Sequence, residues 1–186
     1  MSISTVEHNR TRQSFEGVSS VWLFGYGSLI YKVDFPFLEQ RPATIEGWAR
    51  RFWQGSHDHR GTPEAPGRVV TLIRQPGVTC KGMAYRVSPE VFGHLDVREK
   101  NGYLRFTTAM TFDDGRVEDG LVYIATEDNA AFLGPAPAAD IARHIASSAG
   151  PSGPNRDYLL NLAEALRGLG DDDAHVVEIE EHLRER

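Results

Sequence analysis

The chain has 186 residues, which is enough for one domain with a substantial hydrophobic core. Hydrophobic residues make up 40% and charged residues 25%, as is typical of a globular protein, and the formal net charge is −6. This negative balance gives no support to a nucleic-acid partner or an anionic membrane surface.

The cysteine content and the N-terminal segment predict the cellular compartment of the protein. Cys80 is the single cysteine, which excludes an internal disulfide, and its place in an alternating apolar run predicts a core position. No apolar stretch reaches the roughly 20 residues of a membrane span. Residues 1–20 are polar and lack the apolar centre of a signal peptide. We therefore expect a cytoplasmic protein with a flexible tail at 1–20 and a single domain at 21–186.

The first β-prone run, at 22–25, breaks into the loop Gly25-Tyr26-Gly27-Ser28. Glycines leave successive backbone N–H groups uncovered, and such a loop after a strand can form a nest for an anion or a developing oxyanion. The spacing fits neither a Walker loop nor a nucleophile elbow, so Ser28 is better interpreted as a hydrogen-bonding residue than as a nucleophile. An ordinary strand-to-loop turn is the alternative interpretation.

Strand-like runs and helices follow in an order that predicts the fold class. Gln75-Pro76-Gly77 predicts a hairpin between two of the strands, and Ser88-Pro89-Glu90 is typical of a helix start. The expected strands lie at 43–48, 51–54, 68–74, 79–87, 103–112 and 117–125, and the expected helices at 89–98, 140–149, from 155, and 173–183. This order predicts one α+β domain, a small closed β-barrel with helices.

Glu99 falls at the C-terminal end of the helix predicted at 89–98. The helix dipole presents partial negative charge there, so a carboxylate is disfavoured, and burial would raise its pKa further. Glu99 is therefore a candidate general base. The alternative is a solvated charge paired with Arg98 or Lys100.

The loop after residue 55 contains His57 and His59, which would be half of a metal site if they lay on one side of a strand. The remaining histidines are scattered over predicted helices, so we expect no metal. Asp58 and Arg60 are more simply interpreted as residues that hold the loop together, or Arg60 as a partner for a carboxylate.

Four motifs resemble the ChaC-type γ-glutamylcyclotransferases, and the resemblance covers residues 21–183. The motifs are FGYGSLI at 24–30, WxRRFWQGSxDHRGTP at 48–63, LDxREKxGY at 95–103 and GPSGxNxxY at 150–158. They occur in the family's order, which makes the resemblance specific.

The resemblance implies a small mixed β-barrel flanked by helices. It also implies a carbon–nitrogen lyase that cyclises the γ-glutamyl group of glutathione to 5-oxoproline and releases cysteinylglycine, without metal or organic cofactor. The family's essential glutamate falls on Glu99, which would act as general acid and base. The small-molecule substrate is the only partner implied, with the protein a monomer or homodimer.

The same resemblance suggests which residues meet the substrate. The backbone N–H groups of Tyr26–Leu29 would hold the substrate carboxylate or the oxyanion. By similarity to the wider cyclotransferase superfamily, Tyr123 is expected to meet the γ-glutamyl group. The remaining motif residues would line or shape the pocket. The full expected set is Tyr26, Gly27, Ser28, Leu29, Ser56, Arg60, Tyr103 and Tyr123.

The chain departs from the family pattern at two positions. Phe132 stands where the family usually has tyrosine, which removes a hydroxyl, and Tyr31 stands where it usually has tryptophan, which we expect to affect packing alone. Two other functions remain open from the sequence. One is a cyclotransferase for another γ-glutamyl compound, and the other is a binding module that uses the nest to sense a small anion.

Overall fold

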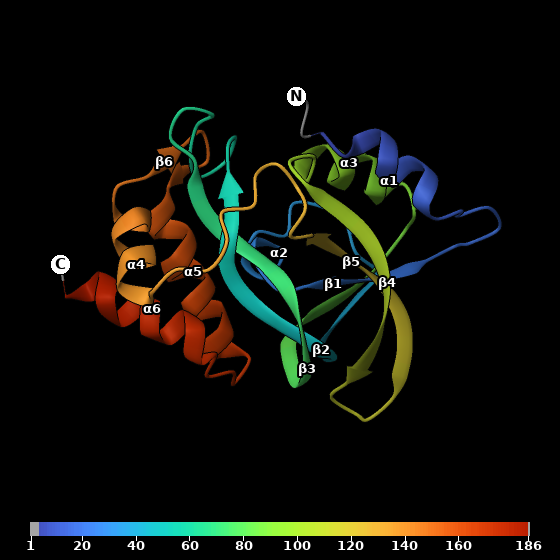
Figure 1. Ribbon diagram of the computed structural model, residues 1–186. Coiled ribbons are helices and arrows are strands. Elements are labelled where there is room, and N and C mark those ends of the chain that lie inside the picture. The colour runs from blue at the N-terminus through green and yellow to red at the C-terminus, as the bar shows by residue number, and fades with distance from the viewer. Residues whose placement is uncertain (1–3, 186) are drawn as a thin grey trace.

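The computed structural model describes residues 4–185, and its centre is a closed five-stranded barrel (Figure 1). The strands follow the order β1-β3-β2-β4-β5, with β1 and β5 parallel and the other neighbours antiparallel. Their bounds are β1 Val21–Gly25, β2 Glu39–Ser56, β3 Gly67–Val87, β4 Tyr103–Phe112 and β5 Val117–Ala125. The mixed β-barrel expected from the sequence is confirmed.

Helices flank the barrel on two sides. In Figure 1, α4, α5 and α6 stand together beside β2 and β3, while α1 and α3 lie next to each other above β4. The helices are α1 Val6–Arg12, α2 Ser28–Tyr31, α3 Val91–Arg98, α4 Ala138–Ala146, α5 Asn155–Gly168 and α6 Ala174–Arg184. Two short strands, β6 Ala149–Gly150 and β7 Gly153–Pro154, pair between α4 and α5.

The β2–β3 ribbon replaces four of the predicted strands by two long ones. The hairpin predicted at residues 75–77 is wrong, because the two halves of β3 both pair with β2 and not with each other. The register shifts there, between Glu46 opposite Thr79 and Trp48 opposite Arg74. Gly77 in β3 and Gly47 in β2 both have a positive φ at this shift, 89° and 83°. Pro76-Gly77 therefore marks a bulge instead of a reversal.

The core has a large part between the barrel and α4–α6 and a smaller part under α3. Cys80 is 3% exposed in the large part, as the sequence predicted, and burial raises the pKa of its thiol to about 11. Fully buried residues of the large part include Ile45, Phe52, Ile145, Leu162 and Ile179. Those of the smaller part include Leu23, Val87 and Leu95. Together they hold the strand ends that form the site.

Part of the segment 1–20 is a helix packed on the barrel, where we expected a flexible tail. Asn9 in α1 is fully buried, and its side-chain amide donates to the carbonyl of Tyr103 (3.0 Å) and accepts from the N–H of Arg105 (2.8 Å). The segment docks through hydrogen bonds to a strand edge, so its polar composition gave no sign of the contact. Residues 1–3 of the expected tail lie outside the described residues.

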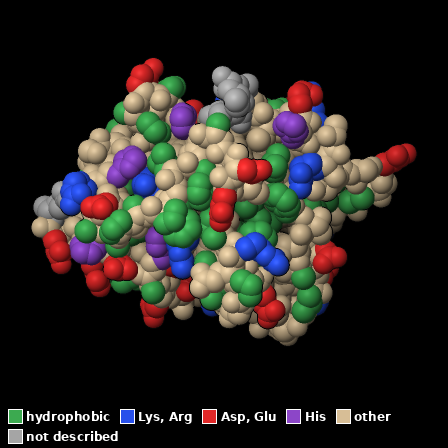
Figure 2. Space-filling view, viewed as in Figure 1, with side chains coloured by type: hydrophobic (Ala, Val, Ile, Leu, Met, Phe, Trp, Pro, Cys, Tyr) green, Lys and Arg blue, Asp and Glu red, His purple; other side chains and the backbone are tan. Residues whose placement is uncertain are grey.

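The surface agrees with the net charge of the chain, which is −6. On the face drawn in Figure 2, Lys and Arg side chains are scattered among acidic ones and form no continuous basic patch. Within residues 4–185, no helix is both long and apolar enough to cross a bilayer.

Candidate active site

All nine residues predicted for the site line two adjoining cavities at one end of the barrel, where β1, β2 and β5 end and β3 and β4 begin. The two cavities share Ser28, Glu99, Tyr103 and Tyr158. Of the other predicted residues, the first cavity is lined by Ser56 and Arg60, and the second by Tyr26, Gly27, Leu29 and Tyr123. Residues from the four sequence motifs therefore converge on one place.

Glu99 is the C-cap of α3, and its backbone N–H donates to the carbonyl of Leu95 (2.8 Å). Its side chain is only 16% exposed. Burial raises the pKa of this carboxyl above its usual value, and the positive charges of Arg98 and His59 oppose the shift without cancelling it. The arrangement provides a carboxylate that can hold and release a proton where the two cavities meet.

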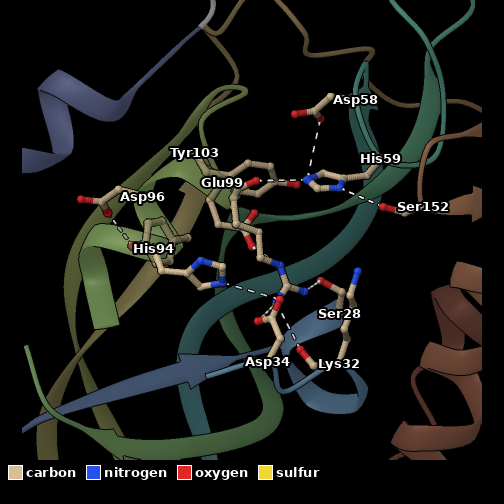
Figure 3. Close-up of polar contacts among 12 residues, drawn as sticks. Ser28, Lys32, Asp34, Asp58, His59, His94, Asp96, Glu99, Tyr103 and Ser152 are labelled. Atoms are coloured by element: carbon tan, nitrogen blue, oxygen red, sulfur yellow. Dashed lines mark hydrogen bonds and ion pairs between the residues drawn. The ribbon is translucent and has the colours of Figure 1, made fainter. Parts of the chain in front are cut away.

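Arg98 ties the end of α3 to the segment after β1. Its partners Ser28, Lys32 and Asp34 lie close together in Figure 3. Its guanidinium donates to the hydroxyl of Ser28 (2.9 Å), to the carbonyl of Lys32 (3.2 Å) and to the carboxylate of Asp34 (2.6 Å). The Nε atom lies 3.7 Å from a carboxylate oxygen of Glu99. The sequence suggested only a charge partner for Glu99 here and missed the clamp, because it depends on contacts between segments about 65 residues apart.

His59 fixes the peptide unit that precedes Glu99. Its Nε2 lies 3.1 Å from the carbonyl of Arg98 and its Nδ1 lies 3.1 Å from the hydroxyl of Ser152 (Figure 3). Because a carbonyl can only accept, Nε2 donates to the oxygen of Arg98, while Nδ1 pairs with the hydroxyl of Ser152. Sequence reasoning considered His59 as a metal ligand and gave Ser152 no function, although both lie in the quoted motifs.

The loop between β1 and α2 lines the second cavity with its backbone. The hydroxyl of Tyr26 donates to the carbonyl of Tyr123 (2.6 Å), which fixes the start of the loop. A Cβ atom on Gly27 would lie 2.8 Å from a methyl group of Val70 and 3.0 Å from the hydroxyl of Tyr158, so only glycine fits. Ser28 and Leu29 begin α2, and the first N–H groups of a helix have no partner within it.

Two tyrosines close the wall shared by the cavities, and both bind the backbone of Val70. The hydroxyl of Tyr103 donates to its carbonyl (2.7 Å), and the hydroxyl of Tyr158 accepts from its N–H (3.2 Å). Burial raises the pKa of both tyrosines, so both remain neutral hydroxyl groups at physiological pH. Tyr158 lies in the fourth motif, which was the only sequence signal for it.

Tyr123 lines the second cavity, but its hydroxyl donates to the carboxylate of Asp96 (2.5 Å). Burial and this carboxylate raise the pKa of the phenol. The guanidinium of Arg105 lies 3.2 Å from the same carboxylate. The hydroxyl of Tyr123 is thus already engaged, which the sequence gave no means to foresee.

Ser56 and Arg60 shape the loop between β2 and β3. The hydroxyl of Ser56 accepts from the backbone N–H of Arg60 (2.9 Å), and the guanidinium of Arg60 donates to the carbonyl of Pro154 (3.1 Å). The same guanidinium lies 5.9 Å from the ring centroid of Tyr158. These contacts hold the loop against β7 and leave both side chains on the wall of the first cavity.

Residues 21–186 match the ChaC-like protein family. The chain belongs to this family. Gamma-glutamylcyclotransferase 2-3 of Arabidopsis thaliana is 48% identical over 177 residues, which cover 89% of each chain. Glutathione-specific gamma-glutamylcyclotransferase 1 of Danio rerio is 45% identical over 179 residues, 90% of each chain.

A solved structure confirms the fold of this ChaC-like protein. The crystal structure of the yeast γ-glutamylcyclotransferase specific to glutathione superposes with a TM-score of 0.81 at 34% identity. The superposition covers 90% of this chain and 96% of the yeast chain. The barrel with flanking helices is therefore a γ-glutamylcyclotransferase-like fold, as the motifs indicated.

The two departures of this ChaC-like chain lie at the edge of the site. The ring of Tyr31 packs edge-on against Tyr158, with centroids 6.1 Å apart. Phe132 forms an isolated β-bridge with Gln54. In the part of the chain that the structure describes, no group of three or more His, Cys, Asp or Glu side chains is placed to hold a metal ion.

Proposed function

We propose that this protein is a glutathione-specific γ-glutamylcyclotransferase. It would convert the γ-glutamyl group of reduced glutathione to 5-oxoproline and release cysteinylglycine, with Glu99 as general acid and base. The observation that carries the proposal is the buried Glu99 carboxylate with a raised pKa at the junction of two cavities. The activity printed in the names of the relatives supports the same reaction.

The reaction needs one conformation of the substrate and one proton carrier. The α-amine of the γ-glutamyl group attacks the amide carbonyl of its own side chain, so the nucleophile is tethered and the site has only to hold the reactive rotamer. An α-ammonium group cannot attack, and its reference pKa is about 7.7–8.0. The substrate therefore reacts as the neutral amine, and Glu99 accepts the proton that this nitrogen loses when it bonds to the carbonyl carbon. The raised pKa of Glu99 makes it a better base than an exposed glutamate.

The second half of the reaction returns the proton. Attack forms a bond between the amine nitrogen and the carbonyl carbon, and the carbonyl oxygen becomes an oxyanion. The bond to the cysteinylglycine nitrogen then breaks, and Glu99 delivers the proton to that nitrogen. The reaction has no net proton change through Glu99 and forms no covalent intermediate with the enzyme.

The two cavities suggest where each half of glutathione lies. The second cavity contains the nest residues Gly27, Ser28 and Leu29, whose N–H groups are donors for a negative oxygen, either the substrate carboxylate or the oxyanion. The first cavity contains the cationic side chains of Lys32 and Arg60, which suit the carboxylate of cysteinylglycine. We place the γ-glutamyl group in the second cavity and cysteinylglycine in the first.

We also place the protein in the cytoplasm. Cys80 is a free and buried thiol, which fits a reducing compartment, and glutathione is abundant where thiols are kept reduced.

The test is to incubate the purified protein with reduced glutathione in the presence of EDTA. Mass spectrometry follows 5-oxoproline and cysteinylglycine, beside parallel reactions with γ-glutamyl-alanine and oxidised glutathione. Equal release of both products from reduced glutathione is the expected result. Turnover of γ-glutamyl-alanine alone would show that the substrate is another γ-glutamyl compound. If the folded protein gave no product from any of the three compounds, it would be a binding module instead of an enzyme.

A further inference from the structure

The N-terminal segment, residues 4–13, lies outside the stretch 21–186 that matches the ChaC-like family, yet it contacts the backbone that carries Glu99 and Tyr103. Glu99 follows the last residue of α3 and Tyr103 is the first residue of β4. The three residues between them belong to no helix or long strand. Their position therefore depends on bonds from neighbouring elements.

The start of β4 has a strand on one side only. β5 pairs with β4 along its whole length, but β2 pairs with it only at the far end, where Ala43 and Thr44 lie opposite Phe112 and Thr111. The other edge at Tyr103 is covered by Asn9, whose side chain supplies both a donor and an acceptor to the strand. Asn9 thus acts in place of a neighbouring strand.

Thr5 makes the corresponding contact with the turn after Glu99. Its backbone N–H donates to the carbonyl of Lys100 (2.8 Å), and its hydroxyl donates to the same oxygen (3.1 Å). Ser4 forms an antiparallel bridge with Asn101. From the other side, the amide of Gln54 donates to the carbonyl of Asn101 (3.1 Å). The turn is therefore held between β2 and the N-terminal segment.

We propose that the N-terminal segment positions Glu99 and Tyr103 for the reaction, with Thr5 and Asn9 as the positioning residues. The inference rests on the proposed function, because it concerns the geometry of the same site. The side chains of both positioning residues point at backbone groups of the turn and the strand, and neither lines the cavities. Their effect on the reaction is transmitted through the placement of the carboxylate and the phenol.

The first variant is Asn9→Ala in the full chain. It leaves the carbonyl of Tyr103 and the N–H of Arg105 without their side-chain partner, so the strand start can shift. We expect kcat to fall about tenfold or more while KM changes little, since misplacing a catalytic group by about 1 Å can cost about 10²-fold. His8→Ala is the matched control, because His8 is exposed on the same helix, and it should keep the wild-type kcat.

The second variant, Thr5→Val, removes one hydroxyl and keeps the backbone N–H and the side-chain shape. We expect a smaller fall in kcat, and this variant decides the outcome if Asn9→Ala does not fold. A variant that merely lowers the folded fraction leaves the pKa of Glu99 in the remaining folded enzyme unchanged, so the acid limb of its kcat profile stays at the wild-type pH. A variant that loosens the turn admits water to Glu99, which lowers its pKa and moves the acid limb of the kcat profile to lower pH.

Both variants keep the charged groups that act on Glu99. A shift of the acid limb therefore reports a change in the turn that follows Glu99. These charged groups are Arg98 and His59, which lower its pKa, and Asp58 and Asp34, which raise it. The neighbouring phenols of Tyr26, Tyr103, Tyr123 and Tyr158 are also unchanged.

The experiments distinguish an error in the proposed function from an error in the positioning role of the N-terminal segment. Absence of glutathione turnover by the wild type contradicts the proposed function before any variant is made. Hydrogen exchange of residues 99–105 needs no turnover, and it should accelerate in Asn9→Ala but not in His8→Ala. Folded Thr5→Val and Asn9→Ala proteins with wild-type kcat, acid limb and exchange rates would overturn the inference.

Discussion

Glu99 occupies a position where its charge costs stability and serves chemistry. It lies at the negative end of α3, and burial outweighs the attraction of Arg98 and His59 in setting its pKa. Because the folded-state pKa lies above that of the unfolded chain, the folded state binds more protons between the two values. Stability is therefore lost as the pH rises through this window.

Replacing Glu99 with glutamine should stabilise the protein at neutral pH, because the variant has no carboxylate to bury. Below the ordinary pKa of a glutamate, about 4.3, both states of the wild type are protonated, and the difference should vanish. Thermal unfolding of both proteins across this pH range measures it. A variant less stable than the wild type at neutral pH would contradict the sign of the pKa shift.

At the scale of elements, the loop between β2 and β3 acts as a support for the end of α3. His59 joins the hydroxyl of Ser152 to the carbonyl of Arg98 and so connects the turn between β6 and β7, the loop and the helix end. His59, which also lines the first cavity, therefore affects the position of Glu99 through the backbone of Arg98.

The variant His59→Ala removes this connection and should lower kcat by about tenfold, with a smaller change in KM, because Glu99 loses its fixed position. His57→Ala in the same loop is the control, since His57 lines neither cavity. Steady-state kinetics on glutathione provides the measurement. Equal kinetic constants for the two variants would show that the connection has no function.

At the scale of the whole molecule, Arg50 connects the helical layer to the nest. Its side chain is about 1% exposed and donates to the carbonyl of Tyr26 (2.7 Å), and it also pairs with Asp173 (2.6 Å) at the start of α6. It donates further to the carbonyl of Lys81 in β3. One buried cation thus holds the loop after β1, strand β3 and the start of α6 together beneath the site.

Arg50→Met should destabilise the fold by roughly 3–5 kcal/mol, because it leaves Asp173 without its buried partner. Arg51→Met is the matched control, since this half-buried neighbour reaches Gln75 at the exposed bulge, and its loss should cost under about 1 kcal/mol. Urea unfolding of both variants gives the comparison. Similar midpoints would mean that the buried pair contributes nothing to stability.

The sequence predicted those features whose signals are local. β4 and β5 follow from alternation, and Ser88-Pro89 placed the start of α3 to within two residues. The motifs contain all of the predicted site residues except Tyr123, and all nine line the same pair of cavities. Gln75-Pro76-Gly77 misled because a bulge and a reversal use the same residues, and only the pairing partner distinguishes them. The Arg98 clamp and the docking of Asn9 depend on polar contacts between distant segments, which periodicity does not encode.

The most direct test of the account is the rate at which Glu99→Gln releases 5-oxoproline from reduced glutathione. We expect a loss of about 10²–10⁴-fold, with glutathione binding to the same variant, measured by calorimetry, close to the wild-type affinity. Glu90→Gln, at the exposed start of the same helix, is the control and should keep full activity. Turnover by Glu99→Gln within about tenfold of the wild type would contradict the central claim that Glu99 carries the proton.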